Sequence, residues 1–122
     1  MIISEAKKIK SNFLANELLK NWVAKFKGIP NIAIEMAEGE LPHIVIKEIE
    51  NYPDLHADDE EYSTILTYQI NLTSKNGDHF NAMQAVHEEM IALGYTRLAI
   101  SPAIPNTKTK EIEKQLVYSQ CL

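Results

Sequence analysis

Apolar and polar residues alternate most regularly between residues 62 and 73. Leu66, Tyr68, Ile70 and Leu72 fall on one side of an extended chain, and the positions between them are mainly polar. Alternation with a period of two over this length is typical of an antiparallel strand with one buried face. We therefore predict a long strand here, with the four apolar residues packed against Trp22 and Met83 of two helices.

Four further segments have the pattern of strands. They cover residues 31–36, 43–49, 95–101 and 112–121. Tyr52, Pro53 and Asp54 are expected to end the second of these strands. The strand 62–73 should run antiparallel to 43–49, and a loop is expected around Pro102 and Pro105.

The N-terminal segment is predicted to be helical. Its apolar stripe becomes regular from residue 14 onward, with the spacing of one helical face. The stripe consists of Leu14, Leu18, Leu19, Trp22, Val23 and Phe26. Ser4 and Ser11 are both candidate N-caps, so the segment is either one helix that turns late onto the core or two pieces that meet near Ser11. Gly28 is expected to end it, with Pro30 following.

A second helix is predicted over residues 79–93. Apolar residues and His87 recur there at intervals of three and four positions. Asp78 is a suitable N-cap, and Gly94 occupies the position where a left-handed glycine commonly ends a helix. The order helix, strands, helix, strands favours an α+β fold. We expect a single-layer, mostly antiparallel sheet of four to five strands with two main helices on one face.

Length and composition are those of a globular protein. The 122 residues are expected to form a single domain, residues 1–122, and 45% of them are hydrophobic. No apolar run approaches the roughly 20 residues that a membrane-spanning helix needs. Cys121 is the only cysteine, so the chain cannot form an internal disulfide, and as a catalytic nucleophile it lacks a partner.

Charge is distributed unevenly along the chain. Residues 1–27 hold six lysines and two acidic residues, a net charge of +4; the total of −5 therefore leaves −9 for residues 28–122. This polarity suits electrostatic contacts between subunits, although two solvated faces would also account for it. The candidate contact residues are Lys7, Lys8 and Lys10 on the basic side, and Asp58, Asp59, Glu60 and Glu61 on the acidic side.

No motif in the chain indicates catalysis, a metal ion or a cofactor. The histidines are His43, His56, His79 and His87, and none of them has the spacing of a zinc ligand pair. The acidic run 58–61 lacks the alternating ligands and the glycine of a calcium loop. The lysines of the first helix are not interleaved with exposed aromatic residues, so nucleic-acid recognition is only weakly indicated.

The order and spacing of these segments resemble the tail terminator and tail-completion proteins of long-tailed phages and prophages, including neighbouring head–tail joining proteins. After the N-terminal helix, residues 41–46 (Leu-Pro-His-Ile-Val-Ile) begin a strand, and residues 52–61 form an acidic loop. Residues 68–72 (Tyr-Gln-Ile-Asn-Leu) belong to the long strand, residues 93–95 (Leu-Gly-Tyr) end a helix, and Tyr118 lies on the last strand.

This resemblance implies a structural protein without enzymatic activity or a cofactor. Proteins of this family form a ring, expected to be a hexamer, on the end of the tail tube. The ring stops tail growth and presents a surface to the head–tail connector proteins. The expected partners are therefore other copies of the chain, the tail tube protein and connector proteins, with no membrane and no sequence-specific nucleic acid. The expected location is the virion tail, and the host cytoplasm during assembly.

Two other functional classes remain open from the residues alone. A small ligand-binding or regulatory α+β module would need a pocket with convergent polar groups. A small enzyme would need a cluster of titratable side chains, and the scattered histidines argue against one.

Overall fold

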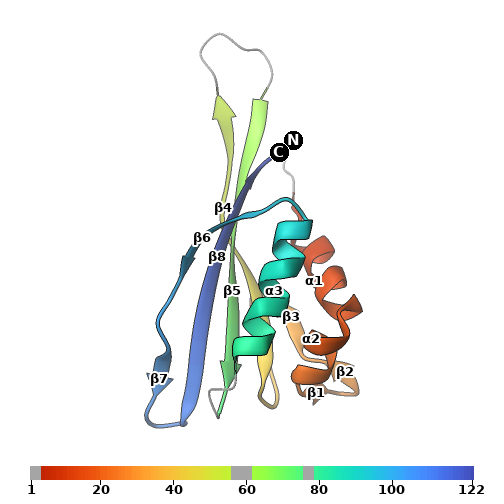
Figure 1. Ribbon diagram of the computed structural model, residues 1–122, viewed down its shortest axis with the longest axis vertical. Helices are drawn as coiled ribbons and strands as arrows, with labels where there is room; N and C mark the ends of the chain where they lie inside the picture. The colour runs from red at the N-terminus through yellow and green to blue at the C-terminus, as the bar shows by residue number, and fades with distance from the viewer. Residues whose placement is uncertain (1–3, 56–61, 76–78) are drawn as a thin grey trace.

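A computed structural model describes residues 4–55, 62–75 and 79–122. It consists of one mixed sheet of six strands, a separate two-stranded hairpin and three helices. The helices are α1 (Ala6–Ala15), α2 (Glu17–Trp22) and α3 (Phe80–Ala92), and Figure 1 shows all three on the same side of the sheet. The α+β class is confirmed, whereas the expected numbers of strands and helices were too low.

The six-stranded sheet has the order β3-β4-β5-β8-β6, with β7 also paired to β8. Its strands are β3 (Ile32–Ile34), β4 (His43–Leu55), β5 (Tyr62–Ser74), β6 (Thr96–Ile100), β7 (Ile104–Asn106) and β8 (Glu111–Cys121). All pairs are antiparallel except β3 with β4, which are parallel. β8 therefore lies inside the sheet although it is the last strand along the chain.

The core lies between the helices and one face of this sheet. Leu66, Tyr68, Ile70 and Leu72 of β5 are fully buried there, as their alternation predicts. Trp22 and Met83 are partly buried and pack against the same core. On the opposite face, Thr67 and Asn71 of β5 are also shielded from solvent, because the flanking strands β4 and β8 cover them on both sides.

The N-terminal helical region is divided at Asn16 rather than near Ser11. Asn16 has an extended backbone, and its side-chain oxygen accepts a hydrogen bond from the backbone N–H of Leu19. No side chain caps α1, so Ser4 and Ser11 do not act as its N-caps. The break reorients the chain, so that Phe13 of α1 and Leu19 of α2 are both fully buried.

Gly28 does not end a helix, contrary to the prediction. α2 ends at Trp22, and residues 25–30 form the hairpin of β1 (Lys25–Phe26) and β2 (Ile29–Pro30). Lys27 and Gly28 have φ angles of 53° and 81°. Two consecutive residues with positive φ form the tight turn that matches the twist of a hairpin, and glycine adopts this conformation at little cost.

The prediction that residues 52–54 end the second strand was also wrong. β4 continues to Leu55, with an irregularity between Glu48 and Glu50, and Pro53 is paired with Thr64. β3 covers only the first part of β4, so Pro53 lies where β4 is an edge strand. Edge positions tolerate proline because they do not need a second row of backbone hydrogen bonds.

The end of α3 agrees with the prediction, and the helix begins at Phe80, one residue after the predicted start. The N–H of Gly94 bonds to the carbonyl of Ile91, and the N–H of Tyr95 bonds to that of Met90, which is a Schellman arrangement. At the start, His79 precedes the helix without a side-chain cap. Asp78 and the acidic residues 58–61 lie outside the described residues.

Candidate functional site

The β6–β7 edge of the sheet exposes several apolar side chains. Among the described residues both strands pair only with β8, and every residue in them is exposed. Leu98 is 60% exposed and Ile104 is 42% exposed. Proteins usually protect such edges, because unpaired backbone groups beside apolar side chains promote association.

The shape of this edge limits how another chain can bind to it. The pairing of β6 with β8 shifts register between Arg97 and Ala99, which leaves Leu98 as an extra residue. Pro105 lies in β7 and has no N–H to donate. Both features interrupt a regular hydrogen-bond ladder. The edge is therefore suited to side-chain contacts rather than to the addition of a long strand.

An apolar hollow of about 400 Å³ lies beside this edge, next to the N-terminus of α3. Its walls include Met83, Ala103 and Ile112 together with the stem of Lys114. Phe80, which the sequence pattern places on the buried face of α3, is 74% exposed at the rim. A large aromatic side chain in this position can contribute substantial buried area to a protein interface.

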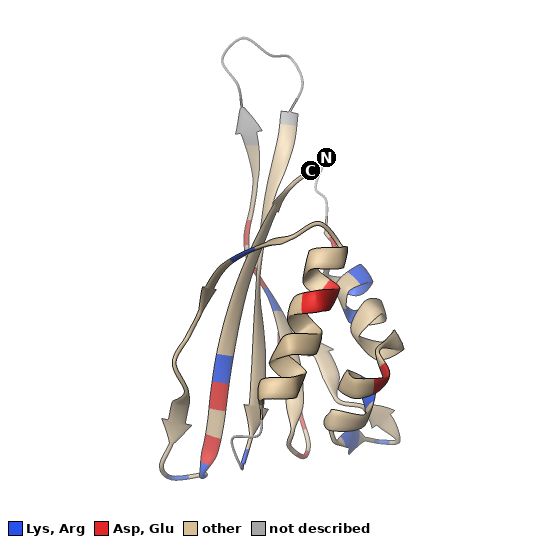
Figure 2. Ribbon diagram, viewed as in Figure 1, with Lys and Arg blue, Asp and Glu red and all other residues tan. Residues whose placement is uncertain are grey.

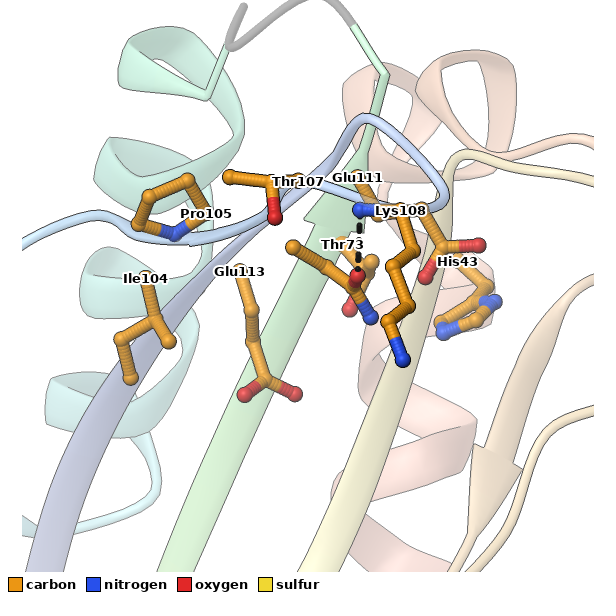
Figure 3. A pocket seen from close by; sticks show the side chains of 9 residues that line it. His43, Thr73, Ile104, Pro105, Thr107, Lys108, Glu111 and Glu113 are labelled. Atoms are coloured by element: carbon orange, nitrogen blue, oxygen red, sulfur yellow. Dashed lines mark hydrogen bonds between the residues drawn. The ribbon is translucent and has the colours of Figure 1, made fainter.

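A second and more polar hollow, of about 520 Å³, lies below the β7–β8 turn (Figure 3). It is lined by His43, Thr73, Ile104, Pro105, Asn106, Thr107, Lys108, Glu111 and Glu113. Strand register explains how residues so distant in sequence meet. His43 pairs with Thr73, Thr73 pairs with Glu113, and Glu113 pairs with Ile104. These four residues therefore form one row across β4, β5, β8 and β7.

Acidic groups predominate among the charged groups of this polar hollow. Lys108 supplies one positive charge against the two carboxylates of Glu111 and Glu113. Within the described residues, neither carboxylate has a cationic group within ion-pair distance. Glu113 accepts one hydrogen bond, from the side-chain amide of Gln115. Figure 2 shows these acidic residues at the end of β8 that adjoins the β7–β8 turn.

His43 is the titratable group on the wall formed by β4. Its Nδ1 atom is buried and has no hydrogen-bond partner among the described residues. Burial lowers the pKa of His43 below the usual histidine value of 6.5, and the nearby Glu111 and Glu113 oppose this shift. The net lowering of the pKa favours the neutral imidazole. At neutral pH His43 therefore does not supply a positive charge to Glu111 and Glu113.

His79 and His87 contribute to packing, whereas His56 lies outside the described residues. His79 is buried beside the Trp22 ring and donates through Nε2 to the carbonyl oxygen of Ile112. His87 Nδ1 lies 3.0 Å from the hydroxyl of Tyr118. Burial raises the pKa of Tyr118 to about 12, which keeps this hydroxyl protonated at neutral pH.

The structure places the predicted basic contact residues on α1. Lys7 and Lys8 are exposed, Lys10 is partly buried, and Lys8 lies 3.8 Å from the carboxylate of Glu5. α1 packs on the core side of the sheet, whereas the row of His43, Thr73 and Glu113 in the polar hollow lies on the opposite face. The β6–β7 edge and both hollows were absent from the sequence-based candidates. The alternation of apolar residues at 98, 100 and 104 was the only local signal of the edge.

The described part of the chain contains no group of three or more His, Cys, Asp or Glu side chains that could hold a metal ion. No helix in this part is long and apolar enough to cross a membrane.

Comparisons with known proteins identify no family for this chain. No family model matches it, and no curated protein matches it. Among solved structures, a chain named Np_888769.1 is similar, with a TM-score of 0.43 and 14% sequence identity. The alignment covers 96% of this chain and 94% of that chain.

Proposed function

We propose that this chain is a structural protein of a phage or prophage tail. In this proposal, copies of the chain form a ring at the end of the tail tube, stop tail growth and present a surface for head attachment. The order of sequence segments that resembles tail terminators supports this function. The structural observation that carries it is the exposed apolar β6–β7 edge, which has a hollow on either side.

The two edges of the sheet differ, and this difference favours a ring. One edge is formed by β6 and β7, with Leu98, Ile100 and Ile104 exposed. The other is formed by the short parallel strand β3 and the uncovered part of β4. A contact between unlike surfaces joins subunits head to tail, and repetition of such a contact closes into a ring when the rotation allows it.

The alternative, a small ligand-binding module, has one structural observation in its favour. The polar hollow brings together His43, Lys108, Glu111 and Glu113, and convergent polar groups of this kind are typical of small-molecule sites. Stoichiometric binding of a metabolite by a chain that does not self-associate would support this function instead of the ring.

Sedimentation velocity of the purified chain tests the proposed function. We expect weak self-association that increases with protein concentration. We also expect the chain to cosediment with tail tubes, because it binds to the ends of the tubes. Association should weaken as salt rises, because ion pairs between exposed groups are screened. A chain that remains monomeric at all concentrations and does not bind tube ends would contradict the proposal.

Substitution of the edge gives a sharper version of this test. Ile104→Lys should weaken self-association by about tenfold or more, since it removes an apolar contact whose burial contributes about 1.5–3 kcal/mol. Leu18→Lys on α2 is the matched control, because Leu18 is 45% exposed and Ile104 is 42% exposed. Equal loss of association in both variants would argue against the β6–β7 edge as the interface.

A further inference from the structure

We propose that the polar hollow receives lysine side chains from a neighbouring copy of the chain, namely Lys25 and Lys27 of its β1–β2 hairpin. This inference rests on the proposed ring and specifies one of its contacts. It assigns a cationic partner to two carboxylates that have no cationic group within ion-pair distance among the described residues.

The chemistry of the hollow suits a lysine side chain. Ile104 and Pro105 form an apolar wall, against which the four-carbon stem of a lysine can pack. Glu111 and Glu113 lie on the adjacent strand β8, where Glu113 is paired with Ile104, and they supply carboxylate oxygens for the ammonium group. Because the hollow holds two carboxylates and one ammonium, it has an excess of one negative charge while His43 is neutral.

The β1–β2 hairpin presents lysines on the opposite side of the molecule. Lys25 and Lys27 are both exposed, and Lys27 lies in the two-residue turn with its ammonium 5.3 Å from the centre of the Phe26 ring. Glu38 and Glu40 lie on the loop that packs against this hairpin. Within the described ranges, however, neither lysine has a carboxylate within ion-pair distance.

The positions of the two surfaces fit a repeating side-by-side contact. In Figure 1 the β1–β2 hairpin and the β7–β8 turn lie at the same end of the molecule and on opposite lateral sides. A neighbour placed beside the β6–β7 edge can therefore bring its hairpin to the level of the hollow. Each subunit would then donate lysines on one side and carboxylates on the other, which is the arrangement of a head-to-tail ring.

The lysines of α1 fit this contact less well. α1 packs against the helix side of the sheet, and the polar hollow lies on the opposite face. Lys8 also has Glu5 beside it. Lys7 and Lys10 therefore serve as matched controls: they carry the same charge and belong to the same basic segment, but they project from a different surface.

A charge-exchange experiment tests the inference. The variants E111K/E113K and K25E/K27E, their combination, and the control K7E/K10E are compared by sedimentation velocity at low salt. Circular dichroism verifies that each variant is folded. We expect either reversal at the contact to weaken self-association by about tenfold or more, because it turns attraction into repulsion. The combined variant should recover most of the loss, and the control should associate as the wild type does.

Each other outcome overturns the inference. If E111K/E113K associates normally, or if the combined variant is no better than the single reversals, the hollow does not receive these lysines, although the ring proposal stands. If K7E/K10E weakens association and K25E/K27E does not, the basic partner is α1. If the wild type shows no association alone or on tube ends, the ring proposal fails as well. If E111K/E113K does not fold, E111Q/E113Q takes its place. This variant should also weaken self-association.

Discussion

Ile70 lies at the centre of the core, with Ile46 of β4 on one side and Leu116 of β8 on the other. All three side chains are essentially inaccessible to solvent. Ile70→Ala should lower the free energy of unfolding by about 2–5 kcal/mol, since two fixed strands prevent the cavity from closing. Urea unfolding measures this change. Ile91→Ala on the exposed side of α3 should cost within about 0.5 kcal/mol, and a similar loss for both would contradict the assigned core.

His43 should make stability depend on pH. Its pKa in the folded chain is lowered, mainly by burial, while the unfolded chain keeps the usual value of 6.5. Below 6.5 the unfolded state therefore binds more protons than the folded state, and stability falls as pH decreases toward the folded pKa. Well above 6.5 both states are neutral at this residue and its contribution to stability is constant.

A His43→Gln variant isolates this effect. Urea unfolding of the wild type and the variant at several pH values above and below 6.5 gives the difference in stability between them. The wild type should lose more stability than the variant as pH falls through this range. Parallel curves for the two proteins would show that His43 does not titrate differently on folding.

Single residues were predicted well where burial follows directly from local alternation, as for Leu66 and Leu72. The wrong predictions concern residues whose burial depends on contacts between elements. The alternation of residues along one segment does not show these contacts. Phe80 follows the apolar spacing of α3, but the buried residues of this helix are Ala82, Ala85, Val86 and Met90, and Phe80 is exposed. Thr67 is polar yet buried, because β4 and β8 flank β5 along most of its length.

Among the elements, the junction of α1 and α2 depends on one side chain. Asn16 accepts the N–H of Leu19 at 3.1 Å and allows the extended backbone that separates the two helices. Asn16→Ala should reduce stability by about 0.5–2 kcal/mol, the usual contribution of an N-cap. Thermal unfolding monitored by circular dichroism measures the loss. Asn16→Asp keeps an acceptor oxygen and should retain most of the stability; an equal loss in both variants would contradict the capping role.

The boundaries of elements were less predictable than their existence. Gly28 and Pro53 are both common ends of elements, yet Gly28 forms a hairpin turn and Pro53 lies within β4. Whether such a residue ends an element depends on the strand beside it. β2 pairs with β1 across the turn at Gly28, and β3 does not reach the part of β4 that contains Pro53. Gly94 was predictable because a Schellman ending needs only local backbone bonds.

At the scale of the whole molecule, the polar hollow could not be predicted from the sequence. His43 and Glu113 are 70 positions apart, and only the registers of β4, β5 and β8 place them in one row. The parallel pairing of β3 with β4 could not be predicted either, because short alternating segments do not reveal the direction of a strand. Charge polarity along the chain predicted electrostatic contacts between subunits, and our proposed contact assigns Lys25, Lys27, Glu111 and Glu113 to them.

The interior position of β8 has a consequence for how the chain folds during synthesis. β6 and β7 pair only with β8, and β8 also covers one side of β5. Until residues 111–121 leave the ribosome, the earlier strands have unpaired backbone and uncovered apolar side chains. At roughly 5–20 residues per second, this interval lasts on the order of a second or more. The nascent chain is therefore most vulnerable to aggregation and to chaperone binding between the emergence of β5 and the emergence of β8 from the ribosome.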